Sequence, residues 1–335
     1  MKYSVNVKSI RPYTVTIERG LIHSISSYVP VHEKIVILTD DGVPIQWIDS
    51  VKDQFDQPLL ITVPQGEASK SLTQLEAITT TMLENGCTRK TVLIALGGGV
   101  IGDLAGLVAA LYMRGISYVQ VPTTLLAQVD SSVGSKVAVN TKKMKNAIGA
   151  FYSPAAVCID PDVLHTLPKS EFSNGMAEVI KYGMILDAEL FGEIEDESAI
   201  KDISRLIYRT VTHKATIVEE DELDQGRRQI LNFGHSIAHA IEKASKGATT
   251  HGQAVAMGMA MMMRKTPHYS RLVSVLNRYG LPTNYDQPEL LLEYMVTDKK
   301  TSTHGIQEIF VDPIGSATIK EIPFEQVKEL LEAQE

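Results

Sequence analysis

The first half of the chain alternates short apolar segments with helical patterns, and this alternation limits the possible folds more than any other feature. β-Branched apolar runs bounded by turn residues are typical of buried strands. Strands that alternate with helices pair in parallel and are covered on both faces. We therefore expect a Rossmann-like α/β domain with a mostly parallel sheet, preceded by a hairpin over residues 1–20. The strand patterns occupy residues 34–40, 59–64, 91–99, 118–124 and 155–160, and the helical ones 72–86 and 103–115.

The pattern becomes helical after about residue 168. A chain of 335 residues exceeds the usual size of one hydrophobic core, so two domains are expected. We predict an α/β nucleotide-binding domain over residues 1–165 and a mainly α-helical domain over 166–335. Helical periodicity in the second part covers residues 171–185, 199–222, 230–244, 252–265 and 324–335.

The charge and the apolar runs exclude several classes of protein. A net charge of -8 argues against nucleic acid as a partner. The longest apolar runs, residues 104–113 and 254–263, cover half of a membrane span, and residues 1–20 lack the apolar region of a signal peptide. Cys87 and Cys158 are too few for a disulfide scaffold. We expect a cytoplasmic protein that binds neither membranes nor nucleic acid.

A glycine-rich turn follows the predicted strand at residues 91–99. Gly97, Gly99 and Gly102 have the G-x-G-x-x-G spacing with which backbone N–H groups hold a pyrophosphate. The acidic residue that usually binds the ribose about 20 residues later is missing. A purely structural turn is therefore an equal alternative. The polar loop at residues 63–72 also follows a strand and could complete a nucleotide site.

Residues 128–152 combine charged and amide side chains with apolar strand patterns. A lysine suits a phosphate group, and Asp130 could bind a hydroxyl or transfer a proton. A single lysine is more often an ordinary surface residue, as we expect for Lys142 and Lys143. The polar residues in question are Asp130, Lys136, Lys142, Lys143, Lys145 and Asn146.

Three histidines and one glutamate indicate a metal site in the second half. Glu178 lies three residues before Lys181 in an apolar segment, which suggests either an ion pair or a buried carboxylate bound to a metal. His235 and His239 have the i,i+4 spacing of one helical face, and His251 begins another helical segment. Histidine and carboxylate ligands are typical of open catalytic zinc sites. The sequence therefore favours a metal site here.

Cations near these histidines suggest an anionic substrate. The spacing predicts that Arg228 and Asn232 lie one turn apart on one helical face with His235, which would suit an anionic, hydroxylated small molecule. Further positive charge could come from Lys214, Lys299 and Lys300, although each could be an ordinary surface residue.

Six segments together resemble, in order, the 3-dehydroquinate synthase family from about residue 60 to 315. The resemblance implies a homodimer that uses NAD and a divalent metal ion, zinc or cobalt. It implies conversion of 3-deoxy-D-arabino-heptulosonate 7-phosphate, an anionic sugar acid phosphate, to 3-dehydroquinate and phosphate in the shikimate pathway. The segments are "GGGVIGDLAG", "RGISYVQVPTTLLAQVDSSVGSKVAVN", "KNAIGAFYSP", "GMAEVIKYGMI", "LNFGHSIAHAIE" and "HGQAVAMGM".

The resemblance also implies a role for individual residues. The metal ligands would be Glu178, His235 and His251. His239 would then face the substrate or contact a metal ligand, rather than bind the metal itself. Substrate binding and proton transfer would involve Asp130, Lys136, Asn146, Lys181, the carboxylate-recognising Lys214, Arg228 and Asn232, one of Lys299 and Lys300 at the phosphate, and Arg114 from the neighbouring subunit. NAD would contact Gly66, Glu67, Lys70, Gly99, Val100, Ile101, Gly102, Asp103, Thr123, Thr124, Lys136, Lys145, Val163 and Thr166.

Four positions depart from the family pattern. Ser135 replaces a usual glycine, Gln253 replaces a usual glutamate, and Gln65 and Ser69 vary the loop at residues 63–72. None of them is a metal ligand in the implied set. We expect them to affect cofactor affinity rather than the type of reaction.

Three alternative functions remain to be distinguished. A related sugar phosphate cyclase would act on a substrate without a carboxylate, against which Lys214, Arg228 and Asn232 argue. A metal- and NAD-dependent polyol dehydrogenase would accumulate reduced nicotinamide. A non-catalytic binding protein is disfavoured because the implied ligand set is complete.

Overall fold

The computed structural model describes residues 1–298 and 305–332 and divides into two compact units. Unit 1 consists of Met1–Pro168 and Ile203–Leu223, and unit 2 of Lys169–Asp202 and Asp224–Glu335. The first division lies close to the predicted boundary after residue 165. The segment Ile203–Leu223, which we had placed in the second domain, belongs to unit 1.

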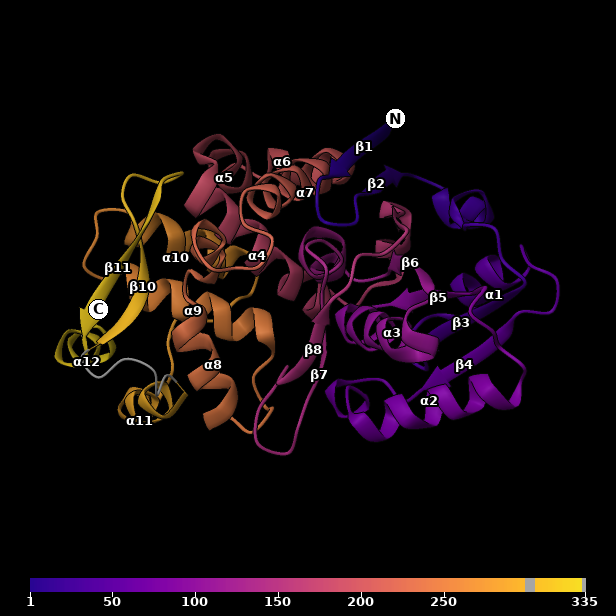
Figure 1. The fold of residues 1–335 in the computed structure, drawn as a ribbon. Helices are drawn as coiled ribbons and strands as arrows, with labels where there is room; N and C mark the ends of the chain where they lie inside the picture. The colour runs from indigo at the N-terminus through magenta and orange to yellow at the C-terminus, as the bar shows by residue number, and fades with distance from the viewer. Residues whose placement is uncertain (299–304, 333–335) are drawn as a thin grey trace. The chain divides into compact units, whose positions relative to one another are not determined.

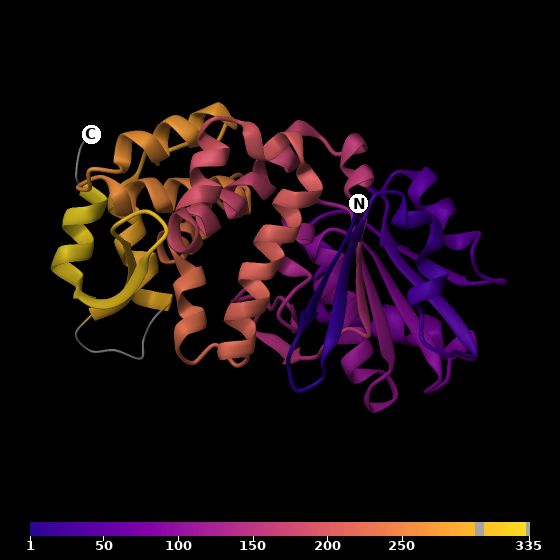
Figure 2. The same ribbon diagram turned by 90° about the horizontal axis from the view of Figure 1, so that it is seen from above.

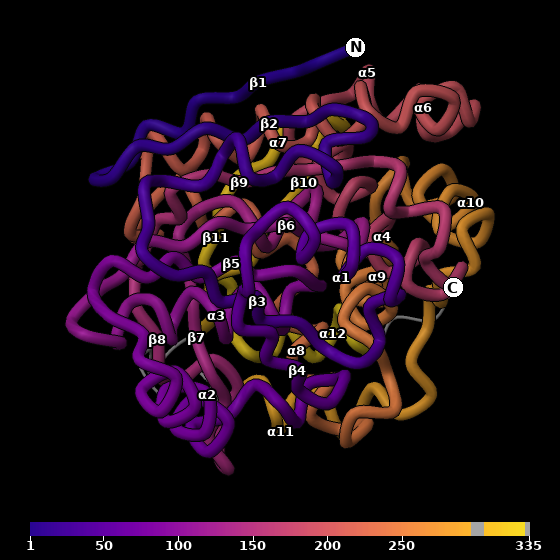
Figure 3. The backbone as a smooth tube through the Cα atoms, turned by 90° about the vertical axis from the view of Figure 1, so that its right-hand side faces the viewer, coloured from indigo at the N-terminus to yellow at the C-terminus, as the bar shows by residue number. Residues whose placement is uncertain are grey.

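Unit 1 is built on one seven-stranded sheet in the order β1-β2-β9-β6-β5-β3-β4. Strand β1 pairs antiparallel with β2, which confirms the predicted hairpin, and every other neighbouring pair is parallel. Figure 3 shows β2, β9, β6, β5, β3 and β4 one below the other, and Figure 2 shows the sheet's twist. The strands are β1 (Lys2–Val7), β2 (Tyr13–Glu18), β3 (Lys34–Asp40), β4 (Leu59–Val63), β5 (Thr91–Gly97), β6 (Ser117–Pro122) and β9 (Ala156–Ile159).

Both faces of this sheet are covered, which is why its central strands are apolar throughout. Side chains alternate along a strand, so Leu93 of β5 packs in one core and the next residue, Ile94, in the other. The first core includes residues of α2 (Leu72–Glu84) and α3 (Gly99–Leu111), and the second includes residues of η1 (Leu21–Tyr28) and α1 (Ile45–Lys52). The predicted α/β class is confirmed.

Several short elements of unit 1 carry residues of interest. A separate antiparallel hairpin joins β7 (Lys136–Val139) to β8 (Ile148–Phe151). Helix α7 (Ile203–Glu220) packs against β1 and a π-helical turn, η4. The short 3-10 and π-helical elements are η2 (Glu67–Ser69), η3 (Tyr112–Arg114), η4 (Ala127–Ser131) and η5 (Pro161–Thr166).

Unit 2 is mainly helical, as expected, but also contains an antiparallel hairpin of β10 (Gly305–Val311) and β11 (Ala317–Pro323) that the sequence patterns did not predict. Figure 1 shows α8 and α9 in orange. The helical elements are α4 (Lys169–Leu186), α5 (Ala188–Glu195), α6 (Ser198–Lys201), η6 (Arg227–Asn232), α8 (His235–Ala244), α9 (His251–Met263), α10 (Tyr269–Arg278), α11 (Pro288–Asp298) and α12 (Phe324–Glu332).

Helix α8 begins five residues later than the pattern over residues 230–244 predicts. Gly234 has a left-handed φ of 74° and separates η6 from α8. Arg228 and Asn232 therefore do not share one continuous helical face with His235, and that prediction was wrong. Over residues 1–298 and 305–332, no helix combines the length and apolar character needed to cross a membrane.

Candidate active site

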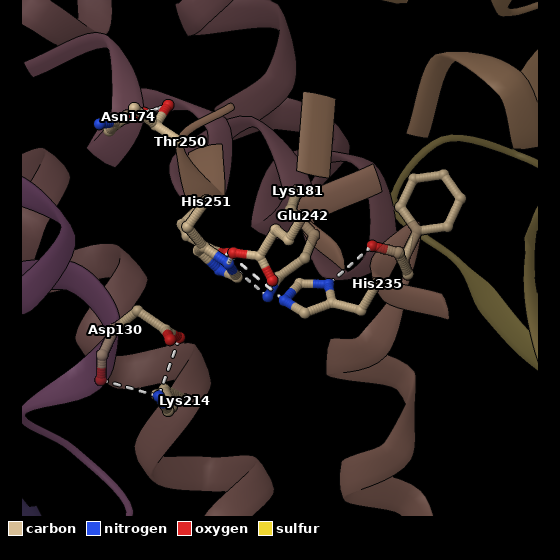
Figure 4. Close-up of polar contacts among 10 residues, drawn as sticks. Asp130, Asn174, Lys181, Lys214, His235, Glu242, Thr250 and His251 are labelled. Atoms are coloured by element: carbon tan, nitrogen blue, oxygen red, sulfur yellow. Dashed lines mark hydrogen bonds and ion pairs between the residues drawn. The ribbon is translucent and has the colours of Figure 1, made fainter. Parts of the chain in front are cut away.

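Helices α4, α8 and α9 of unit 2 each contribute one side chain to a cluster of groups that can bind a metal ion. Glu178, His235 and His251 each offer one ligand atom, and these atoms all lie within 4.8 Å of one another. Oε1 of Glu178 is 3.5 Å from Nε2 of His235 and 3.3 Å from Nε2 of His251. Figure 4 shows the two imidazole rings pointing toward each other.

The start of α9 is fixed by contacts that position His251. The backbone N–H of Thr250 donates to Oε1 of Gln253 at 3.0 Å, which is half of a capping box. The hydroxyl of Thr250 donates to Oδ1 of Asn174 on α4 at 2.5 Å. A glutamine accepts the first of these bonds as a glutamate would, so Gln253 caps the start of α9.

Opposing electrostatic effects act on the cluster. Burial alone would raise the pKa of Glu178, whose side chain is fully buried, but Lys181 and the two imidazoles outweigh burial and hold that pKa well below its usual range. Burial and Lys181 lower the pKa of His235 to about 3. Burial opposes protonation of His251 too, yet its contacts with Glu178 and Glu242 raise its pKa to about 9.

The donor set fits a divalent metal ion. One buried carboxylate and two imidazoles are the ligand types of catalytic zinc sites with open coordination positions. A fully buried glutamate is also costly without strong compensation, which Lys181 supplies in part through a close ion pair. These three residues could therefore hold a metal ion.

The other expected residues of unit 2 lie as follows. His239 is exposed on α8, and its ring centroid is 5.8 Å from that of His235, but it is not one of the three clustered groups. Arg228 is buried on η6, and Asn232 ends that turn half-buried. Lys299 and Lys300 lie outside the described residues.

In unit 1, Asp130 and Lys214 form an ion pair. Nζ of Lys214 on α7 donates to Oδ1 of Asp130 at 2.8 Å and to its backbone carbonyl oxygen at 2.7 Å (Figure 4). Asp130 lies in η4, and π-helical turns occur often at functional sites. This pairing was not predicted, since the family resemblance implies that Lys214 binds the substrate carboxylate with Arg228 and Asn232.

The glycine-rich turn and the loop at residues 63–72 are joined by an ion pair in unit 1. Gly99 begins α3, so the first backbone N–H groups of that helix are available to an anion. Nζ of Lys70 lies 2.5 Å from Oδ2 of Asp103 on the same helix. Nδ2 of Asn140 donates to Oε1 of Glu67 at 2.7 Å. The first contact joins the loop to α3, and the second joins it to the residue that follows β7.

The remaining expected cofactor and substrate residues of unit 1 differ in their burial. Val163 is buried in a core, whereas Thr166 is exposed and accepts a bond from Nε1 of Trp47 at 2.8 Å. The side chain of Thr124 packs against Gly98. Thr123 is buried, Val100 and Gly102 are half-buried and Ile101 is buried, whereas Gly66, Arg114, Lys136, Lys145 and Asn146 are exposed.

Ser135, Gln65 and Ser69 show how three departures from the family pattern are accommodated. Ser135 adopts a left-handed φ of 62°, a conformation that favours the glycine usual at this position, and its hydroxyl lies 2.9 Å from that of Ser153. The side chain of Gln65 fills the space beside Gly42 that a Cβ would need. The hydroxyl of Ser69 donates to the carbonyl of Pro64 at 2.5 Å.

Asp40, an acid that the sequence patterns did not single out, ends a strand at the switch point of the sheet. From β3 the chain moves outward to β4, while from β5 it moves in the opposite direction to β6, so the sheet order reverses between β3 and β5. Ligands of such sheets bind at the carboxyl ends of the strands at this switch point. Asp40 ends β3 beside Gly97 of β5, and burial raises its pKa. Asp40 precedes the glycine-rich turn in sequence, whereas the usual pattern has its acid about 20 residues after the turn.

Comparisons with known proteins agree with one another over nearly the whole chain. The family model described as 3-dehydroquinate synthase N-terminal matches residues 60–174, and the C-terminal model of that family matches residues 175–301. The 3-dehydroquinate synthase of Streptococcus suis (strain 05ZYH33) is 41% identical over 356 residues, covering 99% of this chain and 100% of the relative.

Solved structures of two sugar phosphate cyclases are also similar. A 2-deoxy-scyllo-inosose synthase complexed with carbaglucose-6-phosphate, NAD+ and Co2+ has a TM-score of 0.89 at 26% identity, covering 98% of this chain and 99% of the other. The 2-epi-5-epi-valiolone synthase of Streptomyces hygroscopicus, with NAD+ and Zn2+ bound, has a TM-score of 0.87 at 24% identity, covering 97% and 96%. The second likeness shows the fold alone.

Proposed function

The chain belongs to the 3-dehydroquinate synthase family, and from this premise we propose that Glu178, His235 and His251 hold a divalent metal ion for the family's reaction. The chain is an enzyme of this type, which converts 3-deoxy-D-arabino-heptulosonate 7-phosphate to 3-dehydroquinate and phosphate. The clustering of these three side chains is the observation that supports the metal site. When bound, the metal polarises hydroxyls of the substrate and NAD takes up and returns a hydride.

The chain's own residues would bind and orient the substrate. In unit 2, Arg228 offers a planar fork for the substrate carboxylate, and Asn232 an amide. Lys181 keeps Glu178 ionised and is proposed to donate to a substrate oxygen. His239 is proposed on the substrate side rather than as a metal ligand. In unit 1, Asp130 with its partner Lys214 is proposed for proton transfer.

The NAD site is proposed in unit 1. The start of α3 would bind the pyrophosphate, and Lys70 and Glu67 would contact the cofactor from the neighbouring loop. We add Asp40 as the ribose-binding acid at the switch point. An Asp40→Asn variant should bind NAD more weakly in a fluorescence titration, and unchanged NAD affinity would remove Asp40 from the site. The other proposed contacts are Gly66, Val100, Ile101, Gly102, Asp103, Thr123, Thr124, Lys136, Lys145, Val163 and Thr166.

Zinc or cobalt as the native metal, a homodimer and a cytoplasmic location complete the proposal. In a homodimer, Arg114 would contact the phosphate of the substrate bound to the partner subunit. Three consecutive residues, Met113, Arg114 and Gly115, have φ values of 50°, 68° and 119°. Left-handed backbone at two non-glycine residues is strained and is found preferentially at functional sites, which supports a role for the exposed Arg114.

Another sugar phosphate cyclase is the second candidate, because a solved 2-deoxy-scyllo-inosose synthase is 26% identical to this chain over nearly its full length. The 41% identity to a 3-dehydroquinate synthase over the full length disfavours it. A buried arginine in the metal-binding unit also favours a substrate with a carboxylate.

A phosphate-release assay with the heptulosonate phosphate tests the proposed function. We expect phosphate and 3-dehydroquinate to form together with no build-up of reduced nicotinamide, since the hydride returns to the product. Chelator treatment should abolish turnover, and zinc or cobalt should restore it. Steady accumulation of reduced nicotinamide would indicate a dehydrogenase instead, and full activity in rigorously metal-free protein would remove the metal from the proposal.

A further inference from the structure

The two histidines of the cluster use their ring nitrogens in the same way. Each turns Nε2 toward Glu178, at 3.5 Å for His235 and 3.3 Å for His251. Each therefore has Nδ1 left for a second partner. Nδ1 of His235 lies 3.1 Å from the backbone carbonyl oxygen of Phe233. Nδ1 of His251 lies 3.4 Å from Oε1 of Glu242.

Glu242 is well placed to hold the His251 ring. It lies on α8, two turns after His235, so one helix carries both a clustered histidine and the carboxylate that contacts the other. The side chain of Glu242 is only 8% exposed, so its orientation toward His251 is not that of a solvated surface acid. Figure 4 shows Glu242 in the group of side chains around His235 and His251.

We propose that Glu242 is a positioning residue for the metal centre, an inference that rests on the proposed function. By accepting the proton of Nδ1, its carboxylate would fix the His251 tautomer whose Nε2 is free to bind the metal. A carboxylate behind an imidazole also makes the imidazole a stronger donor, and such partners typically change metal affinity about 10- to 100-fold. His235 obtains only a neutral carbonyl in this position, so the charge of Glu242 acts on one ligand alone.

The test is the zinc Kd of the full-length, metal-free protein, measured by competition with a chromophoric chelator. Glu242→Gln keeps the size of the side chain and removes its charge, and Glu242→Ala removes the acceptor as well. We expect zinc affinity to fall about tenfold in Glu242→Gln and by up to about 100-fold in Glu242→Ala. Glu289→Gln, an exposed acid on α11 of the same unit, is the matched control and should leave the Kd unchanged.

Two further measurements separate positioning from a general loss of structure. The metal-free Glu242→Gln protein should keep the wild-type circular dichroism spectrum and unfold in one cooperative urea transition, because a general loss of structure would change both before any metal is added. The absorption spectrum of the cobalt-loaded variant should differ from wild type, since the orientation of one ligand changes. An unchanged zinc Kd in Glu242→Gln overturns the inference, whereas a wild-type protein that binds no zinc overturns the proposed metal centre itself.

Discussion

At the scale of single residues, the cluster depends on a balance around one buried carboxylate. Glu178 is fully buried, and its ionised form is maintained by Lys181 and by the two imidazoles. Removing one partner of a buried charge leaves the other uncompensated, which is more costly than losing a surface ion pair. Each clustered side chain is therefore expected to matter for metal binding, in contrast to its neighbour His239.

His251→Ala and His239→Ala should differ sharply in metal content. His251 contributes one of the three clustered ligand atoms, while His239 is exposed and lies outside that group. After dialysis against zinc and then buffer, we expect wild-type zinc content in His239→Ala and strong loss in His251→Ala, measured by atomic absorption. Equal loss in both variants would restore the i,i+4 pair of His235 and His239 as the ligand pair.

Ser135 gives a test of backbone strain in unit 1. Its left-handed φ of 62° costs a non-glycine residue roughly 1–2 kcal/mol. Its hydroxyl contact with Ser153 offsets about 1 kcal/mol of that cost. Ser135→Ala loses the contact and keeps the strain, whereas Ser135→Gly loses both. In urea unfolding we expect Ser135→Ala to be the less stable variant by about 1 kcal/mol; the opposite order would show that the φ value carries no strain.

At the scale of elements, glycines bring the helices of the cluster close together. A Cβ at Gly252, directly after His251, would lie 2.4 Å from the carbonyl oxygen of Asn174 on α4. A Cβ at Gly258 on α9 would lie 2.1 Å from the carbonyl oxygen of Gly234, directly before His235. Each clustered histidine is thus adjacent to a backbone contact that tolerates no side chain, and this couples helix packing to ligand position.

Gly258→Ala should therefore weaken both stability and metal binding. The added methyl group forces α8 and α9 apart at the start of α8, an overpacking effect of about 1–3 kcal/mol. Gly192→Ala on α5 is the control, because its Cβ would meet no atom within 4 Å. That variant should instead gain about 0.5–1 kcal/mol, as expected for alanine in a helix interior. Urea unfolding and zinc titration of both variants check this, and equal stabilities would contradict it.

The sequence predicted elements best where burial gives a continuous local signal. The strand pattern at residues 34–40 matches β3, because both of its faces are covered. The start of α8 was misplaced because a left-handed Gly234 interrupts an apolar pattern without changing its period. Asp40 was missed because sheet order, rather than sequence order, brings β3 beside β5. Helical spacing alone suggested His239, since it carries no information on where α9 places His251.

At the scale of the whole molecule, the chain passes between the units more than once. Helix α7 returns to unit 1 after α4, α5 and α6 of unit 2, and it brings Lys214 to Asp130. A fragment ending at Pro168 would therefore lack both the helix that packs on β1 and the partner of Asp130. The proposed NAD residues lie in unit 1 and the clustered metal-ligating residues in unit 2, so the full chain is the functional unit to be assayed.

The proposed homodimer can be tested through Arg114, because a residue that acts on the partner's substrate can be restored by that partner. We expect Arg114→Ala and His251→Ala homodimers to be nearly inactive, the first without its phosphate contact and the second without a metal ligand. In a mixed dimer, the Arg114→Ala chain keeps its own metal site and receives Arg114 from the His251→Ala chain. One of the two active sites of the mixed dimer is therefore intact. Co-expression with two different tags and tandem purification should therefore yield about half of wild-type phosphate release. If Arg114 acts within its own chain, neither site of the mixed dimer is intact and its activity stays at the level of the two variants.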